Sequence, residues 1–131
     1  MKVHIPSRRV ATTGFLAALK ALSTAKGLDV KHSLHIARVI RRAKEAATEH
    51  SEALDALREQ HGGRQDGAML VFDAAEGDDK REKNAAALKA FKDGAKKIGE
   101  TAVEFELPSL IKLPEGLTAD HAEELLEFLE Q

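Results

Sequence analysis

The sequence predicts a helix-dominated α+β fold: a long antiparallel helical hairpin with flanking N- and C-terminal helices and a small sheet of two to three short strands. Apolar residues between positions 36 and 57 recur with the four-three spacing of helices that pack at a shallow angle. The stretches "MKVHIP" and "TAVEFELP" alternate apolar and polar residues, as half-buried strands do. At 131 residues, the chain is interpreted as a single domain spanning 1–131.

The first predicted elements are a short strand and a helix. "MKVHIP" is expected to form a strand that ends at Pro6, and Ser7 is placed to cap the element that follows. A helix is predicted over 8–26, where apolar residues recur at helical spacing. A glycine in its first turns costs about 1 kcal/mol relative to alanine, so the helix proper is expected to begin at Thr12 or Thr13.

The longest predicted helix covers 31–60 and measures about 45 Å at about 1.5 Å per residue. Its four-three stripe consists of Ile36, Ile40, Ala43, Ala47, His50, Leu54 and Leu57. A helix over 79–99 has a matching stripe of Leu88, Phe91, Ala95 and Ile98. We expect these two helices to pack antiparallel as a hairpin, either within one chain or exchanged between two copies.

The segments around the second of these helices predict further strands and a last helix. "AMLVFD" is a short β-prone run that follows the glycine-rich "HGGRQDG". "TAVEFELP" has one apolar and one acidic face, and "LIKLP" is a shorter strand candidate. Thr118 is predicted to cap a terminal helix with one apolar side, formed by Ala122, Leu125, Leu126 and Leu129.

The composition argues against several functional classes. The chain has no cysteine, which excludes disulfides, thiolate zinc sites and thiol nucleophiles. No apolar run approaches the roughly 20 residues of a membrane span, and "MKVHIPSRRV" lacks the apolar core of a signal peptide, so we expect a cytoplasmic protein without membrane contact. His32 and His35 share a helix face, but two imidazoles without a further ligand at matching spacing do not define a metal site.

No catalytic or cofactor-binding residue is predicted. "HGGRQDG" lacks the lysine and the hydroxyl residue of a phosphate-binding loop, and it leads into a strand rather than a helix. None of the serines lies in a strand-to-helix elbow flanked by glycines. We therefore predict that the protein is not an enzyme and uses neither a cofactor nor a metal.

His50 interrupts the apolar stripe of the longest helix. A histidine at such a position is usually a packed residue that requires only a hydrogen bond. Glu45, Glu49 and Glu52 lie off the stripe, so the sequence supplies no second titratable group for chemistry. A structural role is expected, and replacement of His50 by leucine is predicted to leave stability unchanged or to raise it.

Opposite charges are concentrated toward the two ends of the sequence. Residues 1–48 carry ten Lys and Arg against two acids, a formal +8, whereas residues 98–131 carry one Lys against nine acids, a formal −8. If the segments fold against each other, much of this field cancels; if they stay apart, each offers a surface to a charged partner. The candidate interaction residues are Arg38, Arg41, Arg42, Lys44, Glu104, Glu106, Glu127, Phe128 and Glu130.

The basic cluster at positions 38–44 has the spacing to contact the phosphates of a nucleic acid. Three observations count against this interpretation. Aromatic residues make up 4% of the chain, with no Tyr or Trp to stack on bases, acids resume at Glu45 and Glu49, and the acidic C-terminal segment can neutralise the cluster. Nucleic acid is therefore the least favoured partner.

The order of motifs resembles that of a family of short, functionally uncharacterised tailed-bacteriophage proteins. The similarity covers most of the chain, and its most specific parts are "GLDVKHSLHIAR" and the closing segment "VEFELP" followed by "IKLPEGLT". The resemblance brings no catalytic residues. It implies a phage origin, synthesis in the host cytoplasm and a role played through protein contacts.

These observations together predict a non-enzymatic small phage protein that acts through protein–protein contacts, as an accessory structural or assembly component of the virion. Its expected partners are other phage structural proteins or a host protein, and a homo-oligomer fits equally, because helical seams self-associate readily. One alternative is an intracellular inhibitor that uses an acidic surface against a host enzyme or defence complex. The other alternative is nucleic-acid binding through the basic face of the long helix.

Overall fold

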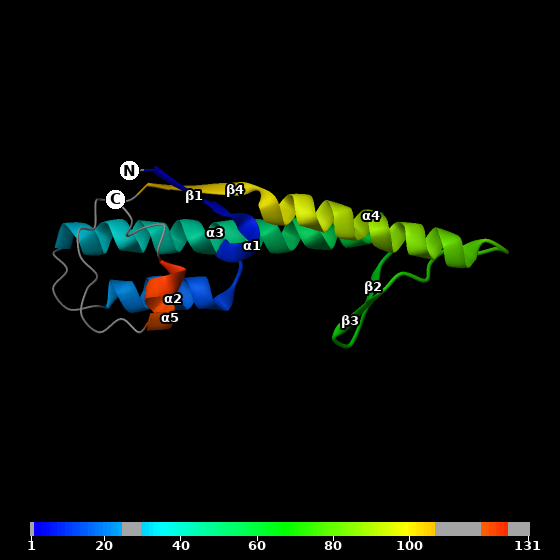
Figure 1. Cartoon of the computed structure of the whole chain (residues 1–131), viewed down its shortest axis with the longest axis horizontal. Coiled ribbons are helices and arrows are strands. Elements are labelled where there is room, and N and C mark those ends of the chain that lie inside the picture. The colour runs from blue at the N-terminus through cyan, green and yellow to red at the C-terminus, as the bar shows by residue number, and fades with distance from the viewer. Residues whose placement is uncertain (1, 25–29, 107–118, 126–131) are drawn as a thin grey trace.

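The computed structural model describes residues 2–24, 30–106 and 119–125, most of which are helical (Figure 1). The elements in chain order are β1 (Lys2–Pro6), α1 (Ser7–Val10), α2 (Thr13–Ser23), α3 (Val30–Gln60), β2 (Arg64–Asp66), β3 (Met69–Val71), α4 (Lys80–Glu100), β4 (Ala102–Glu106) and α5 (Ala119–Glu124). The predicted dominance of helix, the long helix and a small antiparallel sheet are confirmed.

Strands β1 and β4 pair as a two-stranded antiparallel sheet, so the first strand lies beside the strand that follows α4. The register places Ile5 opposite Val103 and Val3 opposite Phe105. Ile5, Val103 and Phe105 are buried, and Val3 packs against the same core from its edge. The apolar faces of the two predicted strands therefore form one surface on the core.

Ser7 begins the short helix α1 and does not cap it. Its hydroxyl instead hydrogen bonds to His50. Thr12 caps α2, because its side-chain oxygen accepts a hydrogen bond from the Phe15 N–H at 3.3 Å. The predicted start at Thr12 or Thr13 is confirmed, whereas α1 is one turn long and too short to show a periodic pattern in the sequence.

The hydrophobic core occupies one end of the molecule. It combines buried residues of β1, α1, α2, the first half of α3 and β4, together with Leu125 after α5. The rings of Phe15 and Phe105 pack within it with centroids 6.0 Å apart, a spacing at which aromatic pairs add about 0.5–1.5 kcal/mol beyond their burial. This core holds β4 next to the first half of α3.

Helix α3 buries a stripe different from the one predicted. Ile36 and Ala43 are buried as expected, but Val39 and Ala46 are the other fully buried residues, and Ile40 is only partly buried. The difference arises because this half of α3 contacts α1, α2 and β4 at once, whereas the predicted stripe assumes a single partner helix.

Beyond Ala46, α3 continues away from the core, and α4 lies beside its C-terminal half (Figure 1). A Cβ built on Gly94 of α4 would lie 2.7 Å from a methyl carbon of Leu57 on α3, so glycine permits a close approach here. Leu54, Leu57 and Phe91 are half-buried. These two helical segments form an arm that projects from the core.

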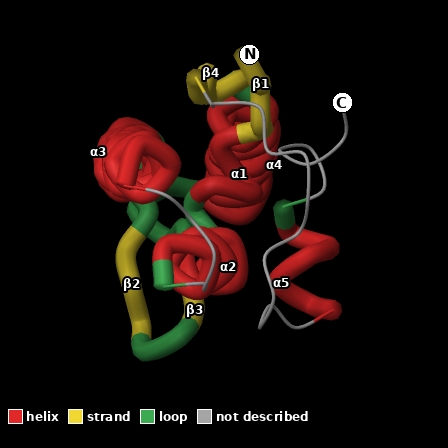
Figure 2. The backbone as a smooth tube through the Cα atoms, turned by 90° about the vertical axis from the view of Figure 1, so that its left-hand side faces the viewer, coloured by secondary structure: helices red, strands yellow, loops and turns green. Residues whose placement is uncertain are grey.

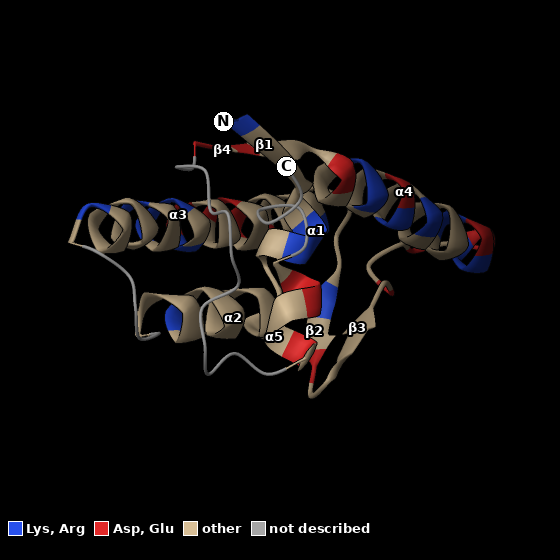
Figure 3. Cartoon of the chain, turned by 60° about the vertical axis from the view of Figure 1, so that its left-hand side comes forward, with Lys and Arg blue, Asp and Glu red and all other residues tan. Residues whose placement is uncertain are grey.

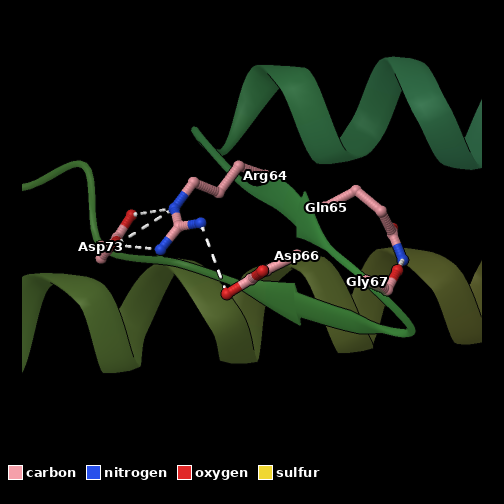
Figure 4. A network of polar contacts seen from close by, with 5 residues as sticks. All are labelled: Arg64, Gln65, Asp66, Gly67 and Asp73. Atoms are coloured by element: carbon pink, nitrogen blue, oxygen red, sulfur yellow. Dashed lines mark hydrogen bonds and ion pairs between the residues drawn. The ribbon is translucent and has the colours of Figure 1, made fainter.

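The insert between α3 and α4 forms a separate two-stranded ribbon of β2 and β3 (Figure 4). Gly67, with φ of +61°, is the first residue of the two-residue turn, where a type II′ turn requires glycine. The Arg64 guanidinium donates hydrogen bonds of 2.8 and 3.1 Å to the Asp73 carboxylate. The "AMLVFD" strand is thus observed, but it pairs with β2 and not with the core sheet.

Two further predictions fall outside the described residues. The strand candidate "LIKLP" lies within 107–118, and the last part of the predicted terminal helix, including Leu126 and Leu129, lies within 126–131.

Candidate functional site

The structure brings together charged residues from the two oppositely charged segments. His35, Arg38 and Arg42 of α3 line one wall of a groove, and Glu104 and Glu106 of β4 line the other. Val39 and Phe105 complete the lining, and the volume is about 220 Å³. We call this feature the α3/β4 groove.

The periodicities of the two elements explain why these side chains meet. His35, Arg38 and Arg42 follow i, i+3, i+7 spacing, which places them on one face of α3. Val39 beside them is buried in the core, so this basic face borders the surface on which β4 packs. In β4 the residues alternate, with Val103 and Phe105 inward and the glutamates outward. Figure 3 shows the resulting arrangement, with basic segments along α3 and acidic segments on β4.

No ion pair joins the two walls among the residues that the structure describes. Arg42 Nη1 lies 3.8 Å from Oε1 of Glu49 on the same helix. Glu104 Oε1 lies 3.5 Å from Lys2 Nζ and 3.8 Å from His4 Nε2, both on β1. Pairs between such exposed side chains contribute at most about 1 kcal/mol each. The charges that line the groove therefore remain available to a partner.

Two predicted interaction residues of α3 lie apart from the groove. Arg41 and Lys44 are exposed and do not line it. At about 100° per residue, Lys44 lies about 120° from Arg38 and about 160° from Arg42 around the helix axis, whereas Arg41 lies about 60° from Arg38 and about 100° from Arg42. Three others, Glu127, Phe128 and Glu130, lie outside the described residues.

The backbone of β4 adds a feature that sequence reasoning missed. The Ser7 N–H donates a 2.8 Å hydrogen bond to the Thr101 carbonyl, which continues the β1–β4 register by one pair. Hydrogen-bonded and non-hydrogen-bonded pairs alternate in an antiparallel ladder, so the pairs at Val103 and Phe105 are bonded. The backbone groups of Glu104 and Glu106 consequently point away from β1.

The edge of β4 opposite β1 lies on the side of the sheet nearer to α3. Figure 2, which views the molecule along α3, shows β4 on the α3 side of the sheet and β1 on the far side. Within 2–24, 30–106 and 119–125, β1 is the only strand that pairs with β4. The groove therefore combines a row of charged side chains with an edge of β4 on which no described strand pairs, which we call the free edge of β4.

A second polar site lies where α1 meets α3. The Ser7 hydroxyl and His50 Nδ1 are 2.5 Å apart, and Ser7 is 7% exposed. They line a cavity of about 260 Å³ together with Arg42, Glu49 and Thr101. The Ser7 N–H is already bonded to Thr101, so it does not provide the backbone donor that an acyl-transfer site would need next to a nucleophile. We interpret the Ser7–His50 pair as structural.

The described ranges contain no group of three or more histidine, aspartate or glutamate side chains placed to share one metal ion. His35 lines the α3/β4 groove, whereas His32 does not. None of the described helices has the length and apolar character needed to cross a bilayer.

Comparisons with known proteins give no family assignment. No protein-family model matches the chain, and no curated protein or solved structure shows a significant match to it. The α3/β4 groove and the residues that form it are therefore the basis on which a function can be proposed.

Proposed function

We propose that this chain is a non-enzymatic protein that acts through protein–protein contacts at the α3/β4 groove. One observation carries the proposal: two arginines on one wall and two glutamates on the other line a single groove without ion pairs between them. Complementary charges of this kind give specificity and orientation to protein association. A catalytic role has no comparable support, because the Ser7 N–H is bonded to the Thr101 carbonyl and so offers no backbone donor beside the Ser7 hydroxyl.

We further propose that α3 and α4 act as a helical hairpin that extends the contact surface. Gly94 against Leu57 allows a close approach of the two helices, and both carry solvent-exposed charges along their length. Half-buried apolar residues on such a pair also suit association with a second copy. A homo-oligomer is thus compatible with the same arrangement.

The biological setting is proposed from the phage resemblance of "GLDVKHSLHIAR" and the segment after α4. We place the protein in the host cytoplasm during infection and in the virion as an accessory structural or assembly component. Its partners would be other phage structural proteins, with a host protein as the alternative.

Quantitative mass spectrometry of gradient-purified particles from the phage or prophage that encodes the chain tests this proposal. A fixed ratio to the major capsid or tail protein is the expected result. Absence from particles, with abundant protein in infected cells, would contradict a virion role and favour the inhibitor of a host enzyme or defence complex.

A direct assay separates protein binding from nucleic-acid binding. Arg41 and Lys44 are exposed outside the groove, and a phosphate-binding helix would use them as well as Arg38 and Arg42. Nucleic-acid affinity would then fall linearly with the logarithm of salt concentration. We expect no measurable shift of DNA or RNA at physiological salt.

A further inference from the structure

We propose that the free edge of β4 accepts an extended segment of a partner protein as an added strand, in which basic residues point outward and acidic residues point toward α3. This inference rests on the proposed protein-binding function and specifies how the α3/β4 groove is used. Addition of a strand to an exposed sheet edge is a recurrent mode of peptide recognition, in which main-chain hydrogen bonds give affinity and alternate side chains give specificity.

The hydrogen-bond pattern of β4 defines the acceptor edge. Because the Ser7–Thr101 bond fixes the alternation, Val103 and Phe105 bond to β1, and the N–H and C=O groups of Glu104 and Glu106 point to the other side. An added strand would bond to those groups. Its residues opposite the two glutamates would share their outward face, because directly opposed residues in an antiparallel pair lie on the same side of the sheet.

The outward face of such a strand should be basic. The existing neighbour already shows this pattern, since Lys2 and His4 of β1 stand opposite Glu106 and Glu104. Lys2 and His4 both approach Glu104, at 3.5 and 3.8 Å. Lysine or arginine on the opposite side of β4 would repeat this cross-strand complementarity.

The inward face of the strand should be acidic, because it would lie over the basic wall of α3. Arg38 and Arg42 are four residues apart, or about 6 Å along the helix axis. Alternate residues of an extended strand are about 6.8 Å apart. Two acidic residues at i and i+2 can therefore each meet one arginine when the strand runs along α3, and β4 and α3 run side by side in Figure 1.

A second copy of β4 would be a poor occupant. Two β4 strands pairing across a two-fold axis would oppose glutamates to glutamates on the outward face, and directly opposed like charges are destabilising. Charged residues on an edge strand are also a common protection against self-pairing. The edge thus favours a different chain with alternating charge.

A synthetic peptide of about seven residues with alternating lysine and glutamate tests the inference on the full chain, because this length spans β4 with one residue to spare at each end. Amide hydrogen exchange by NMR is the readout. We expect the Glu104 and Glu106 amides to become at least about tenfold more protected, since their N–H groups gain acceptors. A peptide of identical composition with its lysines and glutamates in two blocks should give no such protection.

Backbone methylation distinguishes strand addition from loose charge attraction. The lysines of the peptide, which face outward, direct their backbone N–H groups at β4, so N-methylation of the lysines should abolish the protection of the Glu104 and Glu106 amides. The backbone N–H groups of the glutamates of the peptide point away from β4, so N-methylation of these residues should preserve that protection. Equal binding of both methylated peptides would overturn the inference, as would protection confined to residues outside β4.

Variants of the protein provide matched controls. Arg38→Glu should weaken peptide binding about tenfold, whereas Lys44→Glu, which makes the same charge change at an exposed site outside the groove, should have little effect. Equal losses in both variants would overturn the inference. If the peptide fails to bind while Arg38→Glu still removes the protein from its natural complex, strand addition is wrong and the proposed function stands. If the Glu104 amide becomes protected without peptide as the protein concentration rises, a second copy of the chain occupies the edge, and the inference is also overturned.

Discussion

The Ser7 hydroxyl and the His50 Nδ1 atom hydrogen bond to each other at the boundary between the core and the arm. Ser7 lies in the first turn after β1, and His50 lies 43 residues later on α3. The structural role expected for His50 agrees with this geometry, but its partner could not be found in the sequence. A serine at that separation becomes a neighbour only when β1, α1 and α3 pack together.

Replacement of His50 by leucine is now expected to lower the free energy of unfolding by about 1–2 kcal/mol. The buried Ser7 hydroxyl would lose its partner, and an unsatisfied buried polar group costs more than the hydrogen bond itself contributes. The structure thus changes the expectation of unchanged or raised stability. Urea unfolding monitored by circular dichroism measures the effect.

The double variant Ser7→Ala/His50→Leu is the control for this explanation. Removing both partners leaves no orphaned hydroxyl, so its cost should be smaller than the sum of the two single changes by about 1 kcal/mol. Strictly additive losses would show that the hydrogen bond is not the source of the effect.

At the scale of elements, the β2–β3 ribbon depends on an exposed pair of charges. The hydrogen bond from Arg64 lowers the pKa of Asp73 below its ordinary value of 3.8. Desolvation opposes this shift, and the positive charge of Arg64 adds to it. A carboxyl with a lowered pKa in the folded state contributes stability above its unfolded pKa and loses it as pH falls through the folded value.

Acidification should therefore open the ribbon locally. We expect the exchange protection of β2 and β3 amides to be constant above pH 5 and to fall below about pH 3.8 as Asp73 takes up a proton. NMR-detected exchange in an acid titration measures this change. Asp73→Asn should remove the pH dependence of the ribbon; if the acid opening persists in that variant, another group controls it.

The elements differ in how far the sequence could predict them. The long helix was expected over 31–60 and is observed at Val30–Gln60, and the helix expected over 79–99 is observed at Lys80–Glu100. Both are long enough for periodicity to mark their ends. β2 has the sequence "RQD" and no apolar residue, so its strand structure follows from the turn at Gly67 and from pairing with β3.

The α3/β4 groove was predictable only in part. The charges of Arg38, Arg42, Glu104 and Glu106 are evident in the sequence, and so is the alternation of β4. Their meeting depends on β1–β4 pairing and on the core that holds both elements. The free edge of β4 required the hydrogen-bond pattern, which no residue type in the sequence reveals.

At the scale of the whole molecule, burial is uneven. The core gathers at the end formed by β1, α1, α2, the first half of α3, β4 and Leu125, while the arm carries half-buried apolar residues. Segments with fewer buried apolar contacts open at lower free energy than the core. One continuous helix, α3, belongs to both regions.

Hydrogen exchange along α3 should therefore change near residue 46. We expect amides of 50–57 to exchange at least about tenfold faster than those of 36–46, because the arm can open without unfolding the core. NMR or mass-spectrometric exchange of the full chain gives this profile. Uniform protection that rises with protein concentration would instead show that self-association covers the arm.

The fold also determines where the oppositely charged segments of the sequence lie relative to each other. The fold places part of the basic segment and part of the acidic segment in one groove, and among the described residues no ion pair joins its two walls. Glu104 pairs with Lys2 and His4 of β1 instead, and Arg42 pairs with Glu49 of its own helix. The sequence allowed two outcomes: the opposite charges of the two segments could cancel each other, or the segments could form two separate charged surfaces. The α3/β4 groove is a third arrangement, in which residues of both charges line the same groove.

The most direct test of groove-mediated protein binding compares three forms of the protein in purified phage particles: wild type, Arg38→Glu/Arg42→Glu and the matched control Arg41→Glu/Lys44→Glu. Each form is quantified by mass spectrometry relative to the major capsid or tail protein, after circular dichroism has confirmed that all three fold. We predict that wild type and control are retained at the same ratio and that the groove variant is depleted at least about tenfold, corresponding to about 1.4 kcal/mol of lost association energy. Equal retention of all three forms would contradict the claim that this groove is the binding surface.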